Sequence, residues 1–143
     1  SPTMREIVRL ADEKGIEVLL ENMFNFQGSH SASSLEELEK IIKAVGCGFI
    51  LDFDHAYYYS KEKNMNEYKL ILDLLKLKPK MYHLSDGFKS NTGDGHLTLG
   101  KGDLDIKFYL KIIRNGMCTL EIDPPTERNF LESKAYIDKL NLR

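Results

Sequence analysis

Residues 81–105 read MYHLSDGFKSNTGDGHLTLGKGDLD, a short apolar run followed by a long polar loop. The run covers residues 80–84 and is delimited by Pro79 and by Asp86-Gly87, a pattern that predicts a β-strand. Imidazole and carboxylate groups gather at the end of this strand and in the loop behind it: His83, Asp86, Asp94 and His96. Such groups at the far end of one strand are what a metal site or an acid–base site uses.

The composition is that of an ordinary globular protein. The 143 residues suffice for one domain with a core, and 42% of them are hydrophobic. A net charge of −2 gives no general basic surface for nucleic acid or membrane, although a local basic patch is compatible with it. No run approaches the roughly 18 apolar residues of a membrane span, and no signal peptide is visible. We expect a cytoplasmic protein with no membrane partner.

The cysteines indicate the redox state of the protein, and the first residues indicate how the sequence relates to a longer chain. Cys47 and Cys118 are isolated from one another, which favours two buried, reduced thiols of an intracellular protein over a disulfide. The sequence begins at Ser1, without an initiator Met, and enters a predicted helix at once. We therefore expect residues 1–143 to form a single domain that is a piece of a longer chain.

Hydrophobic periodicity divides the chain into alternating helices and strands. The expected strands are residues 16–20, 48–51, 80–84 and 117–120. The expected helices are residues 1–14, 34–45, 66–77, 106–114 and 127–140. Two patterns of Ser or Thr followed three residues later by Glu, beginning at Thr3 and Ser34, are capping boxes that mark helix starts. Residues 53–64 are expected to form a loop.

The strands begin 32 to 37 residues apart, a spacing that predicts βα units and a parallel sheet. Connections from helix to strand are short, and most of those from strand to helix are long. That asymmetry is typical of a (β/α)8 TIM barrel and also of open α/β sheets. Because a complete barrel needs about 250 residues, we predict an α/β chain that forms about half of a TIM barrel, with four parallel strands.

Each predicted strand ends at an ionisable side chain: Glu21, Asp52, His83 and Glu121. One such residue would usually be a helix cap or a turn residue. Capping or turn formation does not explain four such residues at one edge of a sheet, because three neighbouring carboxylates would repel one another and resist desolvation. A divalent cation resolves that conflict. Three oxygen ligands and one imidazole suit Mn²⁺, Zn²⁺, Co²⁺ or Mg²⁺.

A second group of side chains lies close to these in the sequence. His55 follows Asp52 by three residues, and Asp94 and His96 share one loop. They are candidates for a second metal site or for substrate contact, and the alternative is an Asp–His pair that only braces the loop. Lys101 and Gly102 stand in a glycine-rich segment that could approach a phosphate, or could simply be a flexible loop.

Several short motifs together resemble the xylose-isomerase-like TIM-barrel superfamily, which holds sugar phosphate isomerases, epimerases and endonuclease IV. The motifs are Glu21-Asn22, LDFDHA at residues 51–56, HLSD at 83–86, DGHLTLGKG at 94–102 and Leu120-Glu121. The resemblance covers the whole chain, as strands five to eight of the barrel. It implies that the chain is the C-terminal half of such a barrel.

The resemblance also implies roles for the strand-end residues. Glu21, Asp52, His83 and Glu121 match the four metal ligands of the ketose 3-epimerases, whose two glutamates also serve as the acid–base pair on either face of the substrate carbon. His55 matches a substrate contact. The implied activity is that of a divalent-metal-dependent sugar or sugar-phosphate isomerase or epimerase, in which Glu21 and Glu121 transfer protons through an enediolate. The implied partners are a sugar or sugar phosphate, and the N-terminal half of the barrel or a second copy.

Two alternatives stay open. In endonuclease IV, an enzyme of abasic DNA, the position of Glu21 bridges two zinc ions. The positions of Asp52, His83 and Glu121 serve one zinc ion, and those of His55, Asp94 and His96 hold another. All these residue types are present, but residues 51–55 lack the Thr-Cys often seen between Asp and His in the nucleases, which favours the isomerase branch. DNA is a partner only in this nuclease alternative. A catalytically inactive binding member of the superfamily is the second alternative.

Overall fold

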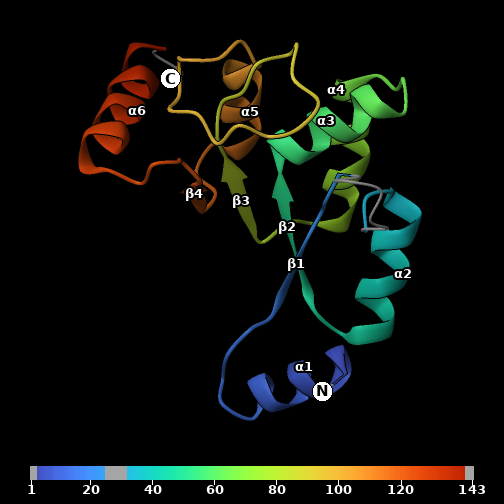
Figure 1. The fold of residues 1–143 in the computed structure, drawn as a ribbon. Helices are drawn as coiled ribbons and strands as arrows, with labels where there is room; N and C mark the ends of the chain where they lie inside the picture. The colour runs from blue at the N-terminus through green and yellow to red at the C-terminus, as the bar shows by residue number, and fades with distance from the viewer. Residues whose placement is uncertain (1–2, 25–31, 141–143) are drawn as a thin grey trace.

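A computed structural model describes residues 3–24 and 32–140 of the chain. Its strands are β1 (Leu19–Glu21), β2 (Gly48–Asp52), β3 (Met81–Leu84) and β4 (Cys118–Leu120). They form one sheet in the order β1-β2-β3-β4, and each neighbouring pair is parallel. Their carboxyl ends therefore meet at one edge, from which the long loop between β3 and α5 (Ile106–Ile113) emerges (Figure 1). The predicted α/β class with four parallel strands is confirmed.

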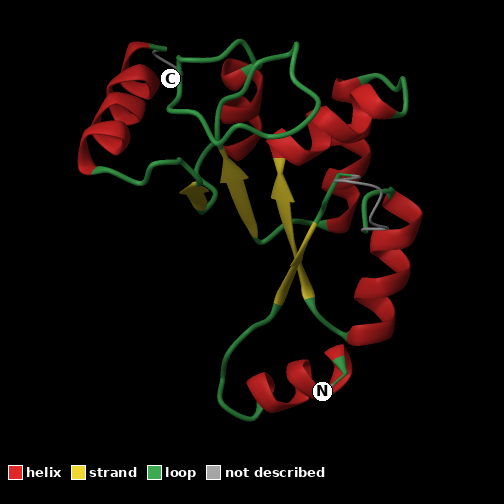
Figure 2. Ribbon diagram, in the orientation of Figure 1, coloured by secondary structure: helices red, strands yellow, loops and turns green. Residues whose placement is uncertain are grey.

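Helices alternate with these strands, as Figure 2 shows. They are α1 (Met4–Asp12), α2 (Leu35–Val45), α3 (Phe53–Glu62), α4 (Glu67–Leu74) with the 3-10 turn η1 (Leu75–Leu77), α5 (Ile106–Ile113) and α6 (Glu127–Lys139). The capping boxes at Thr3 and Ser34 both form, so the two predicted helix starts are confirmed. Within the described residues, no helix has the length and apolar character needed to cross a membrane.

The prediction of a loop at residues 53–64 is wrong, because α3 begins directly after β2. The side chain of Asp52 caps the helix by accepting a hydrogen bond from the backbone N–H of His55 at 2.8 Å. Side chains on several sides of α3 are buried, so the sequence shows no single apolar stripe of helical period. As a result His55 lies on the first turn of a helix, and β2 has no long loop behind it.

Smaller differences concern the ends of elements and the cysteines. β1 covers Leu19–Glu21 instead of residues 16–20, and the helix expected at 66–77 is divided between α4 and η1. Cys47 and Cys118 are both free thiols, as expected, but they are half-buried instead of buried.

The hydrophobic core fills one face of the sheet. Phe49, Leu51 and Leu84 project from β2 and β3 into a cluster of fully or nearly buried side chains contributed by α2, α3, α4 and α5. Because side chains alternate along a strand, residues two apart share a face. Asp52 therefore points to the face opposite this core, together with the half-buried Ile50. The strand-end residues occupy that second, more open face.

Candidate metal centre

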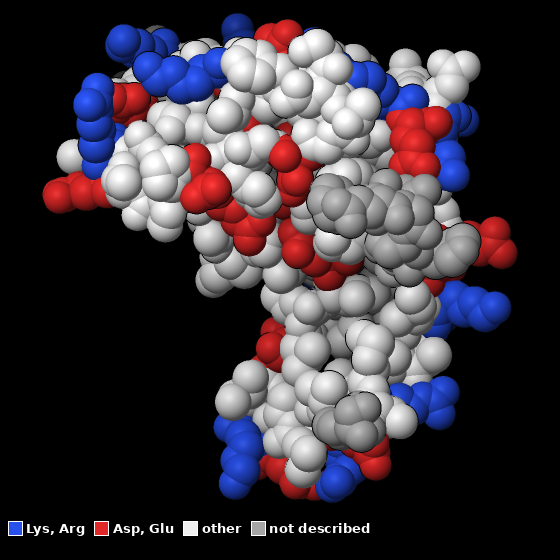
Figure 3. All heavy atoms as spheres, viewed as in Figure 1, with Lys and Arg blue, Asp and Glu red and all other residues white. Residues whose placement is uncertain are grey.

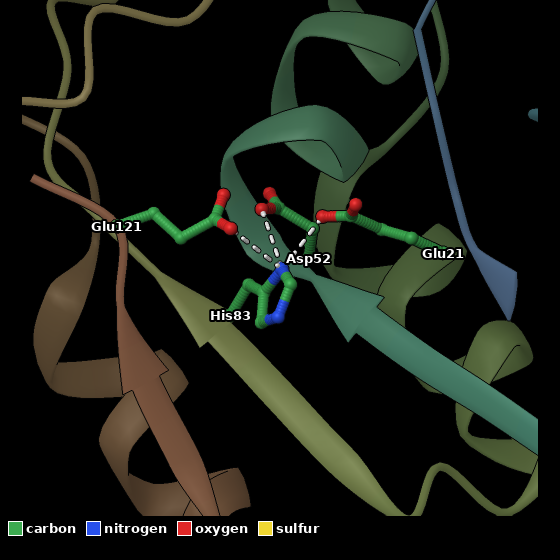
Figure 4. Close-up of side chains that lie close together, drawn as sticks. All are labelled: Glu21, Asp52, His83 and Glu121. Atoms are coloured by element: carbon green, nitrogen blue, oxygen red, sulfur yellow. Dashed lines mark hydrogen bonds and ion pairs between the residues drawn. The ribbon is translucent and has the colours of Figure 1, made fainter. Parts of the chain in front are cut away.

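The four strand-end side chains predicted from the sequence converge at the carboxyl edge of the sheet (Figure 4). Glu21 and Asp52 are the last residues of β1 and β2, His83 lies one residue before the end of β3, and Glu121 directly follows β4. The parallel register places Asp52 beside His83. One potential ligand atom from each of the four side chains lies within 4.8 Å of the others. Their convergence agrees with the sequence; their binding of a metal stays a prediction.

The Nδ1 atom of His83 is the centre of the group. It lies 2.8 Å from Oε1 of Glu21 and 3.2 Å from Oε1 of Glu121. Those two carboxylates reach the imidazole ring from opposite sides, as Figure 4 shows. Asp52 is almost fully buried, whereas the side chains of Glu21 and Glu121 keep 26% and 32% of their surface exposed. One side of the group is therefore open to a ligand.

The electrostatics of this group favour a cation. Burial, together with the charges of Glu21 and Asp54, holds the pKa of Asp52 well above its usual range. The hydrogen bond to Glu21 raises the pKa of His83 despite the opposing effect of burial. Acidic side chains collect near the middle of the view in Figure 3, while Lys and Arg lie mainly toward its outline. Three carboxylates around one imidazole thus fit a divalent ion.

His55, Asp94 and His96 form a second group beside the first. Oδ2 of Asp94 lies 3.0 Å from Nε2 of His55 and 2.8 Å from Nε2 of His96. Nδ1 of His55 donates to the carbonyl oxygen of Asn22 at 2.9 Å, and Nδ1 of His96 donates to that of Glu121 at 3.1 Å. A carbonyl oxygen only accepts, so each Nδ1 carries the proton. The three predicted residues are therefore together, with both Nε2 atoms directed at one carboxylate.

Charge also distinguishes this second group. Burial acts to lower the pKa of His55, but the hydrogen bond to Asp94 and the charge of Asp52 outweigh it and raise that pKa to about 9. The hydrogen bond from His55 correspondingly lowers the pKa of Asp94, against the effect of burial. Nδ1 of His55 lies 3.6 Å from Oε1 of Glu21, so the two groups are in contact. Without a second ion, an imidazolium–carboxylate pair accounts for this arrangement.

Lys101 and Gly102, the predicted phosphate contacts, both have partners within the protein. Nζ of Lys101 lies 3.5 Å from a carboxylate oxygen of Glu132 on α6, which offsets its charge. The backbone N–H of Gly102 donates to Asp86 at 3.0 Å and is therefore not available to an anion. A phosphate contact by Lys101 and Gly102 stays a prediction.

Asp86 is a buried residue whose role the sequence does not reveal. Its carboxylate accepts hydrogen bonds from four backbone N–H groups, those of Gly87, Gly100, Gly102 and Leu104, at 2.9 to 3.3 Å. It thereby fixes the loop that carries Asp94 and His96. The sequence places Asp86 in a turn and among the ionisable groups behind the strand, but does not reveal these partners, which lie up to 18 residues away.

Asn22 and Asp54 are two further buried polar residues that sequence reasoning leaves without a role. The side-chain amide of Asn22 pairs with the backbone of Asp52. Oδ2 of Asp54 accepts a hydrogen bond from Ser85 at 3.0 Å, and burial raises the pKa of Asp54 to about 7. Both residues lie within motifs quoted from the sequence, but their partners are about 30 residues away and follow no spacing rule.

Comparison with known families agrees with this geometry. Residues 2–140 match the family described as xylose isomerase-like TIM barrel. The chain belongs to this family. A parallel sheet whose strand order follows the sequence, with polar side chains at its carboxyl edge, is the arrangement expected of part of such a barrel.

Solved structures of this type share the fold. A D-tagatose 3-epimerase-like protein is 26% identical with a TM-score of 0.72, over 94% of this chain and 50% of that one. The TTHB071 protein from Thermus thermophilus, soaked with ZnCl2, is 25% identical with a TM-score of 0.67, over 93% of this chain and 49% of that one. The apo form of 3-keto-D-glucoside 4-epimerase, YcjR, from E. coli is 19% identical with a TM-score of 0.64, over 95% of this chain and 51% of that one, a likeness of fold alone.

A curated relative is the uncharacterized protein MJ1311 of Methanocaldococcus jannaschii. It is 30% identical over 105 residues, which are 72% of this chain and 34% of the relative. The chain thus spans about a third of that protein and about half the length of the solved xylose isomerase-like structures.

Proposed function

We propose that the chain forms part of a divalent-metal-dependent sugar or sugar-phosphate isomerase or epimerase. The observation that carries this proposal is the position of Glu21 and Glu121 on opposite sides of His83, within one group of four potential metal ligands. Similarity to a D-tagatose 3-epimerase-like protein supports the same class of reaction. The sugar substrate and the divalent metal are parts of this proposal.

The chain's own residues have separate tasks in this proposal. Glu21, Asp52, His83 and Glu121 would hold the ion, which when bound would polarise the carbonyl and hydroxyl oxygens of the sugar. One glutamate removes the proton from the substrate carbon, and the C–H electron pair moves toward the carbonyl to give an enediolate. The other glutamate returns a proton to that carbon from the opposite face. A substrate contact by His55 belongs to the proposal and is supported only by its position 3.6 Å from Glu21, since both of its ring nitrogens already have protein partners.

Solvent exchange tests the proposal directly. The full-length protein, supplied with Mn²⁺ or Co²⁺, is incubated in D₂O with a panel of ketoses and ketose phosphates, and NMR follows deuterium at the carbon next to the carbonyl. We expect incorporation with at least one substrate. Glu121→Gln should abolish it, because an amide cannot accept or return the proton at this position.

A surface glutamate supplies the matched control. Glu39 lies on the exposed side of α2 and pairs with Lys43, so Glu39→Gln should leave the exchange rate unchanged. Equal exchange in the Glu121→Gln variant and the parent would refute the glutamate pair. A protein that binds metal but exchanges no proton of any tested sugar would favour the non-catalytic alternative.

The second group of side chains favours one other function, a zinc phosphodiesterase acting on abasic DNA. Its basis is the direction of both Nε2 atoms, on His55 and His96, toward Asp94. In that case the protein would carry about three zinc ions per chain and cleave abasic DNA, and His96→Ala would remove one ion and the cleavage. In the isomerase proposal the same variant keeps the metal of the first group.

A further inference from the structure

Asn22 joins the first two strand ends through its side chain. It directly follows Glu21 and is only 1% exposed. Its Nδ2 donates to the carbonyl oxygen of Asp52 at 2.9 Å, and the N–H of Asp52 donates to its Oδ1 at 2.8 Å. A side-chain amide offers both a donor and an acceptor, so it can imitate a backbone partner. Asn22 thereby extends the pairing of β1 with β2 beyond Glu21, the last residue of β1 in the ladder.

The same residue also holds His55. The main-chain carbonyl of Asn22 accepts a hydrogen bond from Nδ1 of His55 at 2.9 Å. The backbone N–H of His55 in turn donates to Oδ1 of Asp52 at 2.8 Å. Asn22, Asp52 and His55 therefore form a closed set of hydrogen bonds, with the ring of Phe24 packed 5.3 Å from that of His55. Oδ2 of Asp52 remains directed at His83, 4.0 Å from its Nδ1.

This set has a consequence for a ligand that Asp52 would hold. A carboxylate binds an ion more tightly when its backbone is rigid and one of its oxygens is already held by a hydrogen bond, because the other oxygen is then oriented toward the ion. Asn22 fixes the backbone of Asp52, and through His55 it also fixes that oxygen. No other side chain among the described residues donates a hydrogen bond to the Asp52 carbonyl and accepts one from the Asp52 N–H.

We propose that Asn22 is a positioning residue of the metal centre, which raises the affinity of the site for a divalent cation by holding Asp52 and His55 in place. The inference rests on the proposed metal centre. Loss of a residue that orients a ligand typically lowers metal affinity about 10- to 100-fold, and we expect an effect of that size.

Two substitutions of Asn22 separate positioning from general stability. Asn22→Ala removes both side-chain contacts with Asp52. Asn22→Asp keeps the size and the acceptor for the Asp52 N–H, but sets a carboxylate oxygen against the Asp52 carbonyl. The matched control is Asn66→Ala, because the side chain of Asn66 also accepts a backbone hydrogen bond, from Lys69 at 2.9 Å, but at the exposed start of α4.

The test is a Co²⁺ titration of the full-length protein, followed by the visible absorption of the bound ion. Thermal melts and hydrogen exchange at the Asp52 amide, both without metal, accompany it. We expect both Asn22 variants to bind Co²⁺ about 10- to 100-fold more weakly, with an altered spectrum and faster exchange at Asp52. Asn66→Ala should lower the melting temperature and keep the affinity and spectrum of the parent.

Unchanged Co²⁺ affinity and spectrum in a folded Asn22 variant would overturn the proposal, even if the melting temperature falls. Should Asn22→Ala fail to fold, the nearly isosteric Asn22→Asp decides. Failure of the parent itself to bind Co²⁺ would refute the proposed metal centre and the positioning role with it. Weaker Co²⁺ binding in the Asn22 variants alone supports both the metal centre and the positioning role. The failure of the metal centre, in which the parent binds no Co²⁺, is therefore distinguishable from the failure of the positioning role, in which the Asn22 variants bind Co²⁺ as the parent does.

Discussion

The imidazole of His83 is where the charges of the site meet, and its proton should compete with a metal ion. The hydrogen bond to Glu21, with the nearby carboxylates, raises the pKa of His83, so Nδ1 keeps a proton to higher pH than a free imidazole of pKa about 6.5. A bound ion must displace that proton. The affinity for Co²⁺ should therefore increase from about pH 6 to about pH 8, with proton release that calorimetry in different buffers detects. An affinity independent of pH would contradict this role of His83.

The Asp86 carboxylate holds the loop behind β3 through four backbone hydrogen bonds. Asp86→Ala would leave four backbone N–H groups without their acceptor at a site that is 1% exposed. We expect the free energy of unfolding to fall by about 3 to 5 kcal/mol, measured by urea denaturation. Asp138→Ala removes only an exposed ion pair with Lys134 and should cost less than about 1 kcal/mol. Similar losses in the two variants would contradict the loop-anchoring role.

At the scale of elements, two glycines of the β3–α5 loop should respond in opposite ways to the same substitution. A Cβ on Gly102 would overlap the carbonyl oxygen of Gly87 and a carboxylate oxygen of Asp86. A Cβ on Gly95 would meet only the side chain of Leu97, at 3.5 Å. Gly102→Ala should therefore lower the free energy of unfolding by about 2 kcal/mol or more, and Gly95→Ala should change it by less than about 0.5 kcal/mol. Equal effects in denaturant titrations would refute this account of the loop.

Strands and most helices could be predicted because their signals are local. The capping box at Ser34 and the left-handed Gly46 delimit α2 within a few residues of sequence. α3 could not be predicted, since it is buried on several sides and its periodicity is lost. Its start depends on the Asp52 side chain, to which the sequence assigns only a place in the metal site.

In the candidate site, too, the residues identified by their local sequence position could be predicted, and those that depend on distant partners could not. Glu21, Asp52, His83 and Glu121 could be chosen because parallel strands bring their ends to one edge, so the sequence position of each is sufficient. The residues that hold them could not. Asn22 and Asp86 act mainly through hydrogen bonds to backbone 14 to 30 residues away, and only the folded chain shows those partners.

For the whole molecule, the open face of the sheet and its two outer strands predict assembly. Among the described residues, β1 and β4 each pair with one neighbour only, and Ile50 on the open face is half-buried. Unpaired strand edges and apolar sheet faces promote association. A polypeptide restricted to residues 1–143 should therefore dimerise, aggregate or require the remainder of a barrel. A monodisperse monomer in sedimentation, with a cooperative thermal melt, would contradict this expectation.

The central claim, that one divalent ion is held by Glu21, Asp52, His83 and Glu121, is tested most directly by elemental analysis of the full-length protein. We expect about one Mn, Co, Zn or Mg ion per chain in the parent, little changed in His96→Ala and lost in both Asp52→Asn and His83→Ala. The His96 variant is the matched control, because it removes an imidazole from the neighbouring group. Metal retained after loss of Asp52 or His83, or about three zinc ions per chain with cleavage of abasic DNA, would contradict the account.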